Sequence, residues 1–237
     1  MSAFTPNKQA RGLAASIKLN HLAVCSNFGR IRIRKLDDLD IKVDSLKDAN
    51  EWSEVARYSP SEEHLAVGSH DNTIYVYNAG ETYSLLCKFS LHASFITSMD
   101  WSEEGDYIRS TDGGHELLFW NLETRERDPS GHTSTVDKLW ATNTIKKGED
   151  RDCCKPSGED GTHINYFNRS PDSTIICTAD DFGLVNVFDY PVTSQNAGSR
   201  SYAGHSEHVV RVEFSADGTR LFSVGGQDKA LIQWKIK

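Results

Sequence analysis

Three residues near the end of the chain have the side-chain types of a serine-hydrolase triad. His205, Ser223 and Asp228 could supply a general base, a nucleophile and an orienting carboxylate. Such a site also needs an exposed serine, often on a Gly-x-Ser-x-Gly turn, beside N–H groups that stabilise an oxyanion. Ser223 instead begins the stretch SVGGQDKALIQW, which is expected to place it in the middle of a strand. The sequence therefore predicts no catalytic residue and favours a structural role for all three.

The stretch SVGGQDKALIQW recurs along the chain. AVGSHDNTIYVY at 66–77 repeats its Val-Gly, its aspartate and its closing aromatic residue. Weaker copies are AVCSNFGRIRIR at 23–34, RSTDGGHELLFW at 109–120 and CTADDFGLVNVF at 177–188. The turns that precede four of the copies open with serines that lie 43, 68 and 45 residues apart, namely Ser59, Ser102, Ser170 and Ser215. A period near 44 residues, interrupted once by about 25 inserted residues, is typical of a β-propeller array.

Within each period the pattern is that of short strands joined by tight turns. Runs such as SEVARY, EHLAVGS and TIYVYN are rich in β-branched and aromatic residues. Asp-Asn at 71–72, Asp-Gly at 217–218 and Phe-Gly at 28–29 suit hairpins that need positive φ. The apolar content of the strands is nearly continuous, which favours packing on both faces between neighbouring blades. We therefore expect an all-β propeller of about five blades.

The repeats divide the chain, as one propeller region, into five units. They cover about 12–46, 51–92, 94–130, 132–203 and 204–237, and the fourth contains a charged insertion at 146–160. The fifth unit stops after its third strand, at QWKIK, whereas propeller blades usually have four strands. Five units are compatible with a small closed ring or with an arc of a larger one.

The chemistry of the last unit suits a buried hydrogen-bonded chain. His205, Ser223, Asp228 and Trp234 match the His, Ser/Thr, Asp and Trp positions of the WD-repeat family, with Trp-Lys where that family often has Trp-Asp. The indole N–H can bond the serine, the serine can bond the histidine, and the histidine can bond the aspartate. These four residues are expected to form a structural tetrad.

The other units keep only parts of this pattern. The second keeps Asp71, and the third keeps Trp120 but has Gly114 at the aspartate position. The fourth has Phe188 in place of tryptophan, with Asp180 and Asp181 ahead of the aspartate position. Degenerate copies are tolerable because packing carries most of the stability of a blade.

Charge and composition exclude several classes of function. The 237-residue chain has a formal net charge of −8, although residues 1–36 carry seven Lys/Arg and no acidic residue. The remaining 201 residues hold 19 basic and 34 acidic side chains, which repel a phosphate backbone, so no nucleic-acid partner is expected. No apolar run approaches 18 residues, so no membrane span is expected. The five cysteines have no CxxC spacing and are interpreted as reduced thiols.

The candidate docking residues are few. Arg30, Arg32 and Arg34 alternate and so share one strand face, which could bind an acidic partner or could simply be solvated. His70 lies at a hairpin, where it is a candidate docking residue or a turn residue. Phe95 lies near a predicted blade edge and is expected to pack in the core.

The charged insertion and its surroundings contain residue types that can bind zinc. Cys153 and Cys154 could be combined with His132 and His163, but structural zinc normally uses paired ligands at short spacing. An exposed insertion loop is the favoured interpretation, and no metal or cofactor is expected.

Between these positions the sequence resembles one branch of the WD-repeat family, the echinoderm microtubule-associated protein-like proteins, at their C-terminal end. The resemblance covers about 51–237 and rests on EWSEVARYSPSEEHLAVGSHDNTIYVYN, HASFITSMDWSEEGDYI, LWATNT, EDGTHIN, CTADDFGLVNVFDYP and GHSEHVVRVEF leading to LIQWKIK. It implies the last part of the second of two tandem propellers, so the chain is expected to be a partial segment of a larger protein. The coiled coil, the basic Ser/Thr-rich tail and the first propeller of that family have no counterpart in these residues.

The resemblance implies a cytoskeletal role for a cytoplasmic protein. We expect a non-enzymatic WD-repeat scaffold that binds protein partners, with tubulin or microtubules as the leading candidates. The alternative is a general WD-repeat adaptor in a multiprotein complex that makes no direct tubulin contact. The sequence does not indicate an oligomeric state.

Overall fold

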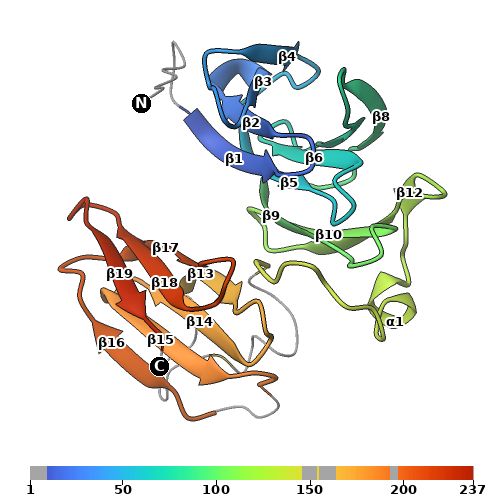
Figure 1. Ribbon diagram of the computed structural model, residues 1–237. Helices are drawn as coiled ribbons and strands as arrows, with labels where there is room; N and C mark the ends of the chain where they lie inside the picture. Colours follow the sequence, from blue (N-terminus) through green and yellow to red (C-terminus); the bar gives the residue numbers. More distant parts are fainter. Residues whose placement is uncertain (1–9, 146–153, 155–163, 193–196, 237) are drawn as a thin grey trace. The chain divides into compact units, whose positions relative to one another are not determined.

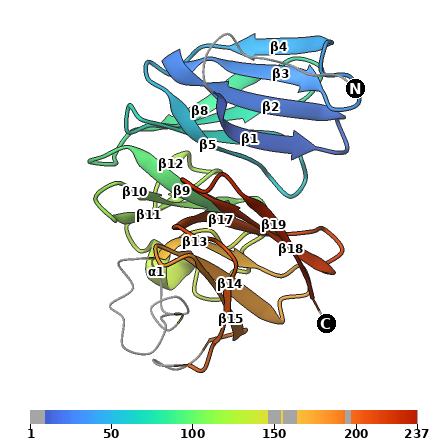
Figure 2. The ribbon, with the colours of Figure 1, turned by 90° about the vertical axis from the view of Figure 1, so that its left-hand side faces the viewer.

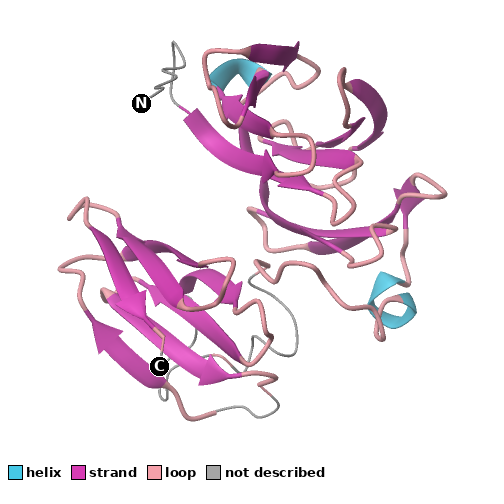
Figure 3. Cartoon of the chain, in the orientation of Figure 1, coloured by secondary structure: helices cyan, strands magenta, loops and turns pink. Residues whose placement is uncertain are grey.

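The computed structural model describes residues 10–145, 154, 164–192 and 197–236, and strands make up most of them (Figures 1 and 3). The chain divides into two compact units, Met1–Ala141 and Thr142–Lys237. The first unit contains three four-stranded antiparallel sheets, and the second contains one four-stranded and one three-stranded sheet. The predicted fold class is confirmed: the protein is all-β and is built from five propeller blades.

Blades 1 to 3 form the first unit, and sequence neighbours pair within each blade; Figure 2 shows β1 to β4 side by side in order. Blade 1 consists of β1 (Ala10–Ser16), β2 (His21–Ser26), β3 (Ile31–Lys35) and β4 (Lys42–Leu46), with the short 3-10 turn η1 (Asn27–Gly29) between β2 and β3. Blade 2 consists of β5 (Ser53–Tyr58), β6 (His64–Ser69), β7 (Ile74–Asn78) and β8 (Ser84–Phe89). Blade 3 consists of β9 (Ile96–Trp101), β10 (Tyr107–Asp112), β11 (Leu117–Asn121) and β12 (Glu126–Arg127), and it is followed by the short helix α1 (Gly131–Ser134).

Blades 4 and 5 form the second unit. Blade 4 consists of β13 (Ile164–Arg169), β14 (Ile175–Asp180), β15 (Leu184–Asp189) and β16 (Arg200–Ala203). Blade 5 consists of β17 (Val209–Phe214), β18 (Arg220–Gly225) and β19 (Leu231–Lys235). Of the charged insertion at 146–160, only Cys154 lies within the described residues, where it is buried.

The apolar strands pack face to face between neighbouring blades. In β6 five of the six residues are buried, which explains why its sequence lacks the alternation of a half-exposed strand. One side of β6 contributes Leu65 and Val67 to a cluster with Ile33 of blade 1. The other side contributes Ala66 to a cluster with Trp101 and Trp120 of blade 3. Blade 2 is therefore stabilised by apolar burial on both of its faces rather than by its own hairpins alone.

The tight turns have the conformations that their sequences predict. Phe28 and Gly29 have φ of 73° and 66°, Asn72 has φ of 63°, and Gly218 has φ of 68°. Glycine and asparagine adopt this left-handed region at the least cost, so Gly29, Asn72 and Gly218 confirm the predicted turns, whereas Phe28 adopts it at a higher cost.

Candidate functional site

The four tetrad residues of blade 5 form one chain of hydrogen bonds. The Nε1–H of Trp234 on β19 donates to Oγ of Ser223 on β18 at 2.8 Å. Nε2 of His205, in the loop before β17, lies 2.7 Å from that oxygen, and its Nδ1 lies 2.8 Å from Oδ2 of Asp228. An imidazole that carries its proton on Nδ1 satisfies both neighbours at once.

This geometry leaves no nucleophile for a hydrolase. The Oγ of Ser223 is shared between an indole and an imidazole, and Ser223 is 0% exposed in the middle of its strand. A substrate carbonyl would have to open the sheet to reach it, whereas hydrolytic sites hold the serine at the surface of a cleft. We therefore propose that the tetrad joins the incoming loop to the second and third strands of the blade.

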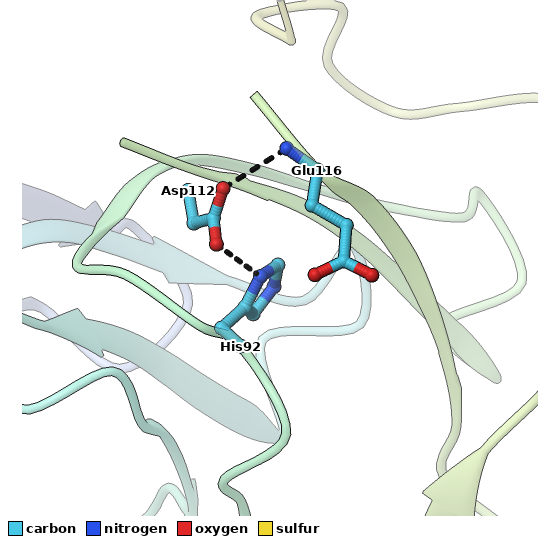
Figure 4. A group of neighbouring side chains, drawn as sticks. All are labelled: His92, Asp112 and Glu116. Carbon is cyan, nitrogen blue, oxygen red and sulfur yellow. Dashed lines mark hydrogen bonds and ion pairs between the residues drawn. The ribbon is translucent and has the colours of Figure 1, made fainter. Parts of the chain in front are cut away.

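A second tetrad lies in blade 3, and its aspartate is not at the expected position. The Nε1–H of Trp120 donates to Oγ of Ser110 at 2.7 Å, and that oxygen lies 2.7 Å from Nε2 of His92. Nδ1 of His92 then faces Oδ2 of Asp112 at 3.4 Å (Figure 4). The interpretation that Gly114 replaces the aspartate is therefore wrong, because Asp112, two residues after the serine, supplies the carboxylate. His92 precedes Ser110 by the same 18 residues that separate His205 from Ser223, and that spacing was the signal available in the sequence.

The carboxylate of Asp112 is saturated by the protein itself. Its Oδ1 accepts the backbone N–H groups of Gly114 and Glu116 at 3.0 and 2.9 Å, and its Oδ2 accepts that of Ser94 at 3.1 Å. The side chains of His92, Asp112 and Glu116 offer ligand atoms within 4.8 Å of one another, as metal ligands do (Figure 4). Nε2 of His92 and both oxygens of Asp112 have hydrogen-bond partners in the protein, whereas Nδ1 of His92 faces Asp112 at 3.4 Å without forming a hydrogen bond. The tetrad therefore accounts for the closeness of His92 and Asp112.

Blades 2 and 4 replace the tetrad with other polar contacts. In blade 2, Oδ2 of Asp71 accepts from the backbone N–H of Asn50 at 2.9 Å and from the hydroxyl of Tyr75 at 2.7 Å. In blade 4, the amide of Asn186 donates to Oδ2 of Asp180 at 3.0 Å. An aspartate near the turn between the second and third strands is thus used in four of the five blades.

The tetrad of blade 3 makes stability depend on pH. Burial lowers the pKa of His92 from its usual 6.5, and the nearby Asp112 opposes this only in part. In the unfolded chain the imidazole of His92 gains a proton near pH 6.5, but in the folded chain it resists protonation. The contribution of His92 to the free energy of unfolding is therefore complete above pH 6.5 and is lost as the pH falls below that value. We expect the free energy of unfolding to fall between pH 7 and pH 5, and to fall less in a His92→Asn variant, as measured by urea unfolding at each pH.

His21, whose pKa is also lowered by burial, is unchanged in that variant and keeps part of the dependence of stability on pH. An identical slope in both proteins would contradict the assignment.

Only two of the four candidate zinc ligands lie within the described residues, and they belong to different units. Cys153 and His163 lie outside the described residues. His132 lies on α1, with its ring 6.0 Å from that of Phe119, and Cys154 is buried in an apolar cluster of the second unit. The favoured interpretation as an insertion loop remains a prediction.

The candidate docking residues occupy different environments. Arg30 is exposed just before β3, whereas Arg32 and Arg34 on β3 are half-buried, and Arg34 donates to the backbone oxygen of Asp40 at 3.1 Å. His70 does not take part in this arrangement but lies between two aromatic rings. It stacks on Phe95 at a centroid distance of 4.5 Å and 12°, and it meets Trp52 edge-on, also at 4.5 Å.

These rings belong to a larger surface feature, which we call the aromatic stack: Arg11, Trp52, His70 and Phe95. The guanidinium of Arg11 on β1 lies 3.9 Å from the centroid of Trp52, and Nε2 of His70 lies 2.7 Å from Oε2 of Glu54. The stack therefore joins blades 1, 2 and 3 at the end where the first strand of each blade begins. Phe95 is 38% exposed, so the prediction that it packs in the core is wrong.

The sequence alone does not identify Trp52 and Arg11 as surface partners. Each lies just before or just inside the first strand of a blade, where a regular repeat gives no sign that side chains of different blades will meet.

Among the described residues, no helix is long and apolar enough to cross a membrane.

Comparisons with known proteins place this geometry among WD-repeat propellers. A family model described as the echinoderm microtubule-associated protein second beta-propeller matches residues 2–236. The chain is 45% identical over 239 residues to the ciliary WD repeat-containing protein ctxp80 of Euplotoides octocarinatus, which covers 100% of this chain and 33% of that protein. It is 43% identical over 192 residues to the 77 kDa echinoderm microtubule-associated protein of Lytechinus variegatus, covering 80% of this chain and 29% of that protein. The human echinoderm microtubule-associated protein-like 3 is 35% identical over 244 residues, covering 96% of this chain and 27% of that protein.

A solved structure gives the same fold at low sequence identity. A chain in the crystal structure of the mitotic checkpoint complex superposes with a TM-score of 0.55 and 16% identity, covering 94% of this chain and 60% of that one. This likeness shows the fold alone. The chain spans about a third or less of the length of each curated relative named above.

Proposed function

Since the chain belongs to the echinoderm microtubule-associated protein-like family, we propose that it acts as a non-enzymatic WD-repeat scaffold at the cytoskeleton and binds tubulin or microtubule-linked partners through its propeller surface. The names of two relatives describe those proteins as microtubule-associated. The segment shared with them is mainly the blades, so the blades are where a shared binding surface is to be sought.

The aromatic stack carries this proposal. Tryptophan and arginine are among the residues that dominate binding energy at protein interfaces, and Phe95 adds an exposed apolar ring beside them. Backbone hydrogen bonds hold the stack in place. The N–H of His70 donates to the carbonyl oxygen of Trp52 at 2.8 Å, and the N–H of Gly113 donates to the carbonyl oxygen of Phe95 at 2.8 Å. A surface that is rigid before binding loses little conformational entropy on binding.

The negative charge of the chain indicates which forces could hold it to tubulin. A net charge of −8 does not draw the protein to another acidic surface, so contact with tubulin through the stack would depend on apolar and ring contacts. Salt screens exposed charges and leaves such contacts largely unchanged. Binding through the stack should therefore persist at moderate salt.

The test is cosedimentation with polymerised microtubules, accompanied by a pulldown of soluble tubulin. The wild-type chain is expected to pellet with microtubules, and a Phe95→Ser variant is expected to bind about fivefold more weakly, the equivalent of about 1 kcal/mol for one interface ring.

A matched control is Phe182→Ser, which removes another exposed phenylalanine from the second unit, at 56% exposure. This variant should bind like the wild type, and circular dichroism should show both variants folded. A wild-type protein that stays wholly in the supernatant at low salt would exclude direct lattice binding and leave the adaptor without tubulin contact as the function.

A further inference from the structure

A second surface of the first unit lies between the outer strands of blades 2 and 3. There β8 and β12, each the last strand of its sheet, border an open groove of about 440 Å³. Its floor is made by Phe89 and Trp120, whose rings stack at 4.8 Å and 20°, and its wall includes Leu91 and Pro129. Leu91 is 61% exposed, so the groove offers apolar surface to a partner.

The floor of this groove is rigid. Trp120 is the indole of the blade 3 tetrad, in which Ser110 accepts its N–H at 2.7 Å. Phe89 packs against it from blade 2, and both rings are almost fully buried. The groove therefore keeps its shape without a ligand, as binding sites generally do.

The rim of the groove is basic on an acidic protein. Lys88, Arg125 and Arg127 line it against a single acidic residue, Glu126, whereas the whole chain has a net charge of −8. All four side chains are exposed. Arg127 lies 4.0 Å from Glu116, but both are well exposed, so this pair is too loose to neutralise the rim. The amino group of Lys88 lies 5.0 Å from the ring centroid of Tyr75, a cation–π contact that favours this position of the lysine side chain.

We propose that this groove binds an extended acidic segment of a partner protein that carries an apolar side chain. The basic rim complements the acidic residues, the exposed side chain of Leu91 offers an apolar contact above the rigid floor, and β12 is an edge strand to which an extended backbone can be added. This surface shares no residue with the aromatic stack, so the inference goes beyond the proposed function and does not depend on it.

A nucleic acid fits the groove less well than a peptide does. Its backbone would meet the basic rim but would also approach a protein that is acidic overall, and the almost fully buried floor rings offer no open face on which a base could stack. An acidic peptide places its charges only at the rim and packs an apolar side chain against Leu91.

The test uses fluorescence anisotropy with a labelled peptide, EDEFLEDE, and its charge-reversed counterpart, KRKFLKRK. We expect EDEFLEDE to bind the full chain and the Kd to rise with salt, and we expect KRKFLKRK not to bind. A Lys88→Glu/Arg127→Glu variant should weaken EDEFLEDE binding about tenfold or more, since each reversal converts an attraction into a repulsion. Leu91→Ser should weaken it about threefold without changing the salt dependence.

The matched control is Lys42→Glu, which reverses an exposed charge on β4 of blade 1 and should leave the Kd unchanged. Equal affinity of the wild type and the double variant for EDEFLEDE would overturn the proposal. So would competition by a single-stranded DNA oligonucleotide that matches the affinity of the peptide. A self-associated wild type that Leu91→Ser converts to a monomer would also overturn it, because a second copy would then occupy the groove.

Discussion

Replacing Ser110 with alanine is expected to lower the free energy of unfolding of the first unit by about 3 kcal/mol, because the change leaves two buried polar groups without a partner. In the folded protein the hydroxyl of Ser110 joins the indole of Trp120 to the imidazole of His92. Ser110 is 0% exposed and Trp120 is 1% exposed, so water cannot replace the lost oxygen. Urea unfolding followed by tryptophan fluorescence measures the effect, since four of the five tryptophans lie in residues 10–141.

Two further variants test whether the hydrogen bonds are responsible. Ser223→Ala removes the matching hydroxyl from blade 5, where Trp234 is only half-buried, and is expected to cost about 1 kcal/mol because water can reach the indole. Ser110→Thr keeps a hydroxyl, as blade 4 does with Thr178, and should lose less than half of the alanine effect. Equal stability of the alanine and threonine variants would contradict the tetrad, because only the threonine variant retains the hydroxyl.

The sequence predicts the blades and the tetrad of blade 5 because both depend on spacing along one chain. A period near 44 residues marks the repeats, and four residue types at the expected positions mark the tetrad. Spacing failed in blade 3, where the aspartate follows the serine by two residues instead of five.

The structure explains how two positions can serve the same purpose. Gly225 in blade 5 follows its serine by two residues, as Asp112 does in blade 3. A Cβ added to Gly225 would lie 1.8 Å from the carboxylate oxygen of Asp228, so the carboxylate of Asp228 occupies the space into which a side chain at 225 would extend. Either position can therefore place a carboxylate beside the histidine. This substitution of one backbone position for another is visible only in three dimensions.

The two surfaces could not be predicted for a related reason. Arg11, Trp52 and Phe95 belong to different blades and meet only because those blades pack side by side. In the same way Lys88 and Arg127 line one groove although they lie on the outer strands of two blades. A repeat pattern identifies each blade but contains no information about which side chains extend across to the next.

Replacing Gly29 with alanine is expected to lower the free energy of unfolding by about 4 kcal/mol, among the largest effects of a single substitution. Gly29 has φ of 66°, and a Cβ there would lie 2.0 Å from the carbonyl oxygen of Ala49 and 2.9 Å from that of Glu51. Both contacts are with backbone, so no side-chain rotation can relieve them. The loss is measured by urea unfolding in parallel with the wild type.

The control separates the clash from the unfavourable backbone conformation. Gly105 has φ of 77°, and a Cβ there would meet nothing within 4 Å, so Gly105→Ala carries only the conformational cost of about 1 kcal/mol. Equal losses in the two variants would show that the segment 49–51 yields to the added methyl group. If the added Cβ meets the carbonyl oxygens of Ala49 and Glu51, the segment 49–51 has to move. This segment leads directly to Trp52 of the aromatic stack. Gly29→Ala should therefore weaken partner binding through the stack even where the protein still folds, whereas Gly105→Ala should leave binding unchanged.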